Sequence, residues 1–75
     1  MARLSGVTAI EVIRVLEKKG FVFQRSRESH RLYRHPESGR RVTVSFHRGK
    51  SIPPGTLLNI LREAGLTKEE FPELL

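Results

Sequence analysis

The sequence predicts one α+β domain, in which helices cover one face of a three-stranded antiparallel sheet. Apolar residues recur at helical spacing near the N-terminus and again at residues 57–61. Three β-prone segments separated by turn residues lie between these two helical patterns. The 75 residues, 37% of them hydrophobic, are enough for one small core. We therefore expect a single domain over residues 1–75 with the order α-β-β-β-α, followed by a short C-terminal helix.

The first helix is expected at about residues 9–19. Thr8 and Glu11 have the spacing of a capping box, in which each side chain satisfies a backbone N–H of the other residue. An apolar stripe follows at helical spacing, and Gly20 supplies the residue after which helices commonly end. These signals indicate an amphipathic helix with one buried side.

Aromatic and β-branched residues predict strands at about residues 21–25, 30–35 and 41–46. Polar residues 26–29 and the sequence Pro36–Gly39 are typical of connecting turns. The third segment alternates strictly between polar and apolar residues, as a strand with one buried face does. The three strands should form an antiparallel meander.

The length of the second turn decides where His30 points. A four-residue turn places His30 opposite Ser45, on the open face of the sheet together with His47. A five-residue turn instead points both His30 and Arg34 inward, beside Phe46. Because burying two unpaired polar side chains costs more free energy than burying one, we favour the four-residue turn.

Two further helices are expected after the strands. Pro54 suits the first position of a helix, where its missing N–H has no partner to lose, and Gly65 marks the end of that helix. Thr67 and Glu70 form a second capping box, which predicts a short helix that presents Phe71 and Leu74.

The positive charge is concentrated in the middle of the chain. Residues 25–50 contain eight Lys and Arg against two Glu, which equals the net charge of +6 of the whole chain. Seven of the eight cations are arginine, whose planar guanidinium suits phosphate contacts. This block favours a nucleic acid or another polyanion as partner, although a basic sheet surface also serves solubility and protects sheet edges from aggregation.

Several classes of protein are disfavoured. The chain has no cysteine and no aspartate, and its three histidines lack the spacing of a zinc motif, so we expect no metal and no cofactor. No apolar run approaches the roughly 20 residues of a membrane span, and the N-terminus lacks the apolar core of a signal peptide. We therefore expect a cytoplasmic protein without membrane association.

Metal-free RNA cleavage is a chemistry that these residues could support. RNA carries its own nucleophile, the 2′-hydroxyl, so an enzyme needs a base, an acid and cations that hold the phosphate. An imidazole can serve either proton role. His30 is one candidate, and it could equally be an ordinary surface residue of a strand. His47 and Lys50 are candidates for a second proton carrier, whereas His35, which precedes Pro36, fits a turn residue.

Short motifs along the whole chain resemble the HicA toxin family, also called the YcfA type. The stretches that carry the resemblance are Gly20-Phe21, Glu28-Ser29-His30, Arg34-His35-Pro36, Val42 to His47, Pro53 to Leu57 and Ala64-Gly65-Leu66. Members of this family are small RNA-cleaving proteins of toxin–antitoxin pairs with a fold like that of double-stranded-RNA-binding domains. The resemblance implies that His30, the histidine of the family's G-S-H motif, is the catalytic residue.

Two positions differ from the family pattern. Glu28 stands where the motif has glycine, and Ser45 stands where the third strand has proline. A carboxylate two residues from His30 could orient its ring or repel phosphate. The resemblance also implies a HicB antitoxin that neutralises the toxin by covering its active site.

The resulting functional hypothesis is the toxin of a type II toxin–antitoxin system, a metal-independent endoribonuclease that cleaves mRNA through His30. Ser29 and His47 are candidate assisting residues, and the candidate RNA-binding residues are Arg27, Arg31, Arg34 and Lys50. We expect a monomer when the toxin is alone and a higher-order complex with the antitoxin. Two alternatives remain: a non-catalytic RNA-binding module on the same scaffold, and a protein-interaction domain with an acidic partner.

Overall fold

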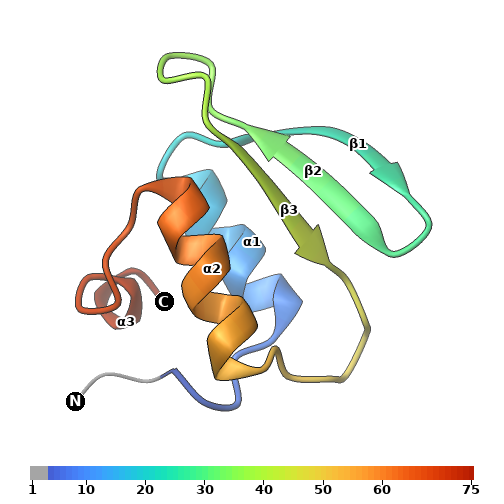
Figure 1. The fold of residues 1–75 in the computed structure, drawn as a ribbon, viewed down its shortest axis with the longest axis vertical. Coiled ribbons are helices and arrows are strands. Elements are labelled where there is room, and N and C mark those ends of the chain that lie inside the picture. The colour runs from blue at the N-terminus through green and yellow to red at the C-terminus, as the bar shows by residue number, and fades with distance from the viewer. Residues whose placement is uncertain (1–3) are drawn as a thin grey trace.

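A computed structural model describes residues 4–75, so the first three residues of the predicted domain lie outside the described part. Its elements are α1 (Ala9–Lys18), β1 (Val22–Arg27), β2 (His30–Arg34), β3 (Arg41–Ser45), α2 (Pro54–Ala64) and α3 (Phe71–Leu74). The sheet is antiparallel with strand order β1-β2-β3. Helices α1 and α2 lie on the same side of the sheet and pack on β3, while β1 is the strand farthest from them (Figure 1). The α+β prediction is confirmed, and the arrangement is that of a double-stranded-RNA-binding-domain-like fold.

Helix α1 begins with the predicted capping box. The backbone N–H of Thr8 donates to the Glu11 carboxylate at 3.0 Å, and the N–H of Glu11 donates to the Thr8 hydroxyl at 3.3 Å. The helix ends at Lys18, one residue earlier than predicted, and the N–H of Phe21 donates back to the carbonyl of Leu16 at 2.9 Å. This hydrogen bond holds Phe21 against the last turn of the helix, and the Phe21 side chain is buried in the core.

The first strand differs from the prediction at both ends. Phe21 is buried in the core and does not join the sheet, and β1 instead continues to Arg27. The turn to β2 therefore has only two residues, 28 and 29, because Arg27 pairs with His30. Gln24 has no partner in the ladder and forms a β-bulge between Phe23 and Arg25.

The register between β2 and β3 matches the four-residue turn. His30 pairs with Ser45, and Arg34 pairs with Arg41. The N–H of His35 then donates to the carbonyl of Arg40 at 2.9 Å, which closes the ladder and leaves Pro36–Gly39 as the turn. The predicted register is confirmed, and with it the assignment of His30 to the face away from the helices.

The core lies between this sheet and the helices, and among residues 4–75 it holds no buried polar or charged side chain. The largest fully buried side chains are Phe71, Leu16, Leu57, Leu61, Val7, Val12, Val15, Val42 and Val44. Helix α2 has Pro54 at its start and ends at Ala64; Gly65, the residue after it, has a left-handed φ of 75°, as expected. The capping box of Thr67 and Glu70 forms, with distances of 2.8 and 3.1 Å, although the helical residues begin only at Phe71.

The two-residue turn between β1 and β2 contains a strained residue. Glu28 has a φ of 57°, a left-handed conformation that favours glycine. The substitution Glu28→Gly should therefore raise the free energy of unfolding by about 1 kcal/mol, since the Cβ clash is removed. Urea denaturation measures the change.

The matched control for this substitution is Glu37→Gly. It removes the same charge from an exposed turn position whose φ is not positive, so it should leave stability unchanged or reduce it. If the two glycine variants unfold at the same urea concentration, Glu28 is not strained.

Candidate active site

The face of the sheet that the helices leave uncovered carries several cations and one imidazole. Cross-strand partners share a face, and Tyr33, Val42 and Val44 point into the core, so their strand neighbours point outward. We call this surface the open face; its residues are Val22, Arg25, Arg27, His30, Leu32, Arg34, Arg41, Thr43 and Ser45. Four guanidinium groups and one imidazole lie on it, and none of its residues is acidic.

His30 is the first residue of β2 and is exposed. Its backbone is held between Arg27 of β1 and Ser45 of β3. Within residues 4–75 no hydrogen bond engages the His30 ring. The ring lines a shallow hollow, called here the His30 hollow, together with Arg25, Ser26, Arg27, Leu32 and Thr43. A phosphate bound there would meet guanidinium groups and an exposed imidazole.

The predicted RNA-binding arginines fall on different faces. Arg27 is beside His30, and Arg34 lies at the other end of β2 on the same open face. Arg31 points to the opposite face: it pairs with Val44, and its guanidinium lies 4.2 Å from the centre of the Phe46 ring. This cation–π contact gives Arg31 a packing role at the margin of the core. Arg31 is therefore not placed beside the His30 ring.

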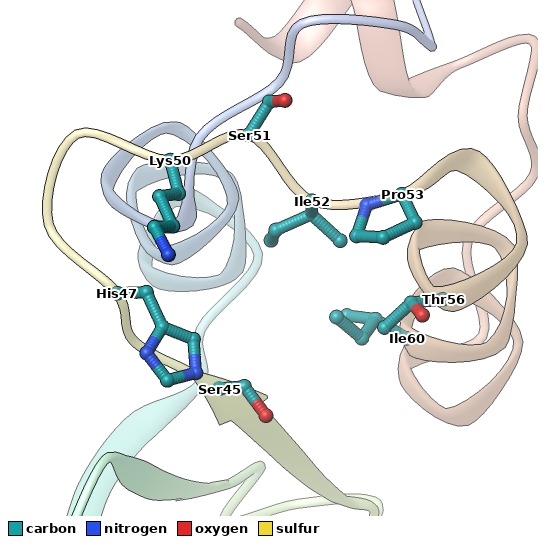
Figure 2. Close-up of a pocket in the computed structure, with 8 residues that line it drawn as sticks. All are labelled: Ser45, His47, Lys50, Ser51, Ile52, Pro53, Thr56 and Ile60. Carbon is teal, nitrogen blue, oxygen red and sulfur yellow. The ribbon is translucent and has the colours of Figure 1, made fainter.

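The predicted assisting residues are also distributed unevenly. Ser29 is the second residue of the turn, half-buried, and its carbonyl accepts the N–H of Phe46 at 2.6 Å. His47 and Lys50 follow the end of β3 and line a separate hollow (Figure 2). The structure thus does not place His47 in the His30 hollow, because the chain leaves the sheet after Ser45. Ser45, which pairs with His30, also lines this second hollow.

His35 is a turn residue, as its position before Pro36 indicated. Its Nδ1 accepts the backbone N–H groups of Glu37 and Ser38 at 3.3 and 3.2 Å. The proton therefore resides on Nε2, which donates to the carbonyl of Lys19 at 3.0 Å. The ring also packs edge-on against Phe21, with 5.2 Å between ring centres. These contacts join the second turn to the end of α1.

Sequence reasoning missed two cations of the open face, Arg25 and Arg41. The strict alternation of the third strand could have identified Arg41, since Val42 beside it points into the core. Arg25 could not have been placed in the same way, because the bulge at Gln24 shifts every later residue of β1 to the other face.

Metal ligands are sparse in the described structure. No group of three His or Glu side chains within residues 4–75 could hold a metal ion. In the same part of the chain, no helix has the length and hydropathy that a bilayer crossing requires.

A comparison with protein families gives a match that covers most of these elements. The family model of the HicA toxin of bacterial toxin–antitoxin systems matches residues 10–66, well over half of the chain. The chain belongs to the HicA toxin family. The matched region contains all of the open face, and membership of the family implies an antitoxin partner. No curated protein gives a significant match to the chain.

His30 and His35 have different surroundings, so their replacement by alanine should have different effects on stability. His35→Ala should lower the free energy of unfolding by about 1–3 kcal/mol, because three hydrogen bonds and the edge-on packing of the ring against Phe21 are lost. His30→Ala should change stability by no more than about 0.5 kcal/mol, since the ring is exposed. Urea denaturation of both variants tests the contrast, and equal losses would contradict it.

Proposed function

We propose that this HicA-family toxin is a metal-independent endoribonuclease that cleaves mRNA, with His30 as its proton-transfer residue and a HicB-type antitoxin as its neutralising partner. The observation that carries the proposal is the open face, where one exposed imidazole lies beside Arg25 and Arg27, on a surface with four guanidinium groups and no carboxylate. Family membership supplies the toxin role.

The reaction uses the substrate's own nucleophile. The 2′-oxygen attacks the adjacent phosphorus as its proton is removed, and the bond to the 5′-oxygen of the next nucleotide breaks as that oxygen gains a proton. The products are a 2′,3′-cyclic phosphate and a free 5′-hydroxyl. His30 carries one of these two protons, and neither transfer requires a metal ion.

The arginines of the open face bind the RNA backbone and the charge that develops at phosphorus. Arg25 and Arg27 are two residues apart on β1, about 6.6 Å along a strand, so their guanidinium groups can contact successive phosphates. Arg34 and Arg41 pair across β2 and β3 at the far end of the face. The cations therefore extend over the whole sheet, which fits a strand of RNA rather than a single phosphate.

The same face would receive the antitoxin. The excess of six positive charges lies in the segment that forms the sheet and the following loop. A HicB-type partner with an acidic surface over the open face would neutralise these charges and block access to His30 together. One contact would thus inhibit both RNA binding and proton transfer.

Replacement of the proposed proton carrier tests the enzyme directly. His30→Ala should reduce the rate of RNA cleavage by roughly 10²–10⁴-fold, and EDTA should leave the wild-type rate unchanged. Gel analysis of a defined RNA after incubation with purified protein measures both effects. RNA that stays intact with wild-type protein yet shifts on a native gel would favour a non-catalytic RNA-binding module.

The salt dependence of binding tests the role of the arginines. In the His30→Ala background, a further Arg25→Gln or Arg27→Gln substitution should reduce the slope of log K against log salt by roughly 0.7 per residue on single-stranded RNA. Arg14→Gln is the matched control, because Arg14 is exposed on α1, on the helical side of the sheet. An equal loss of slope in the control would show that the open face is not the RNA-binding surface.

A further inference from the structure

A second hollow lies where β3 gives way to the loop and to the first turn of α2, and we call it the β3-end hollow. Its lining residues are Ser45, His47, Lys50, Ser51, Ile52, Pro53, Thr56 and Ile60. Figure 2 shows His47 and Lys50 together on one side, and Thr56 and Ile60 on the opposite side. Its volume is about 110 Å³, well below the roughly 300–1,000 Å³ of pockets that hold drug-sized ligands. It fits one small ring.

Two residues that line this hollow, Ser51 and Ile52, are held by backbone contacts. The N–H of Ile52 donates to the carbonyl of Val7 at 2.6 Å, and Ser51 forms a β-bridge with Thr8. The segment before α1 therefore fixes the position of Ser51 and Ile52. Because these bonds link distant parts of the chain, the hollow is formed before any ligand arrives.

The chemistry of the lining suits a flat ring that carries hydrogen-bond acceptors. Ile52, Pro53 and Ile60 supply apolar contact area, while Lys50 offers only donors. None of the lining residues is acidic, so an RNA chain is not repelled. An aliphatic side chain of a protein could pack against the isoleucines and Pro53, but it would offer Lys50 no hydrogen-bond acceptor.

The position of the hollow links it to the proposed catalytic residue. Ser45 lines the hollow and is the direct cross-strand partner of His30. The Cα atoms of such a pair lie about 4.5–5.5 Å apart, less than the length of one nucleotide. The hollow extends from Ser45 to α2 on the covered side of the sheet, whereas the His30 ring lies on the open face. A base next to a phosphate bound at His30 would therefore reach the hollow around the end of β3.

We propose that the β3-end hollow binds the base of a nucleotide next to the cleaved phosphate and prefers uracil; this inference rests on the proposed endoribonuclease function. Lys50 can donate to the exocyclic oxygen of a keto base, whereas cytosine and adenine present an amino donor at the equivalent position. The volume favours a single ring over the two rings of guanine. Cleavage then depends on sequence through one base.

Filling the hollow tests the proposal. Thr56→Trp adds a bulky ring at the wall of the hollow, and Asn59→Trp adds the same ring to an exposed position of α2 that does not line it. Cleavage of four otherwise identical RNAs, with a single position next to the scissile bond varied among the four bases, gives the preference of each protein. Wild type and Asn59→Trp should cleave the uracil substrate fastest, and Thr56→Trp should lose this advantage, a change of roughly tenfold.

A direct binding measurement does not depend on the tryptophan variants folding. In the His30→Ala protein, uridine 3′-monophosphate should shift the methyl NMR signals of Ile60 and Thr56, and cytidine 3′-monophosphate should shift them at least several-fold less at equal concentration. Lys50→Ala should remove the difference between the two nucleotides while retaining the folded spectrum.

The outcomes separate this inference from the proposed function. Cleavage by wild-type protein with no preference among the four bases, together with equal NMR shifts, overturns the base site and leaves the ribonuclease intact. A Thr56→Trp toxin with an unchanged base profile that its antitoxin no longer neutralises overturns it in favour of a protein-docking site. Absence of any RNA cleavage by wild type overturns the proposed function, and the base site with it.

Discussion

The register between β2 and β3 is the constraint on which the rest of the structure depends. Side chains alternate with a period of two, so a slip by one residue would turn His30 toward the helices and Tyr33 toward solvent. The turn Pro36–Gly39 sets this register, and His35 fixes that turn by joining it to the end of α1. The side chain of His35 thus helps to hold the turn that sets the face of the sheet on which His30 lies.

The positive charge of the central segment has two different uses. Some of it stabilises the fold: Arg31 lies over Phe46, and Arg40 donates to the carbonyl of Glu63 at 3.2 Å near the end of α2. The open-face arginines differ in place: Arg25 and Arg27 line the His30 hollow, and Arg34 and Arg41 lie at the far end of the face. Two of the eight Lys and Arg in residues 25–50 thus make contacts within the fold.

The proposed reaction requires few protein groups, because the substrate supplies the nucleophile. A domain of 75 residues has room for one core and one functional face. Its catalytic requirement is then limited to proton transfer and charge stabilisation, which an exposed strand residue and its neighbours can provide. In the two proposals, proton transfer takes place at His30 and base recognition in the β3-end hollow, and Ser45 adjoins both.

Local signals in the sequence determined the elements: the capping box of α1, Pro54 and Gly65 at the ends of α2, and the alternation that identified β3. They also predicted the register and hence the exposure of His30, because one turn length and one hydrophobic face suffice for that.

Only the tertiary structure decided which other groups join His30. The bulge at Gln24 brings Arg25 and Arg27 to the open face, while the end of the sheet at Ser45 takes His47 away. Both depend on pairing and packing between distant segments, and no local pattern of residue types encodes them.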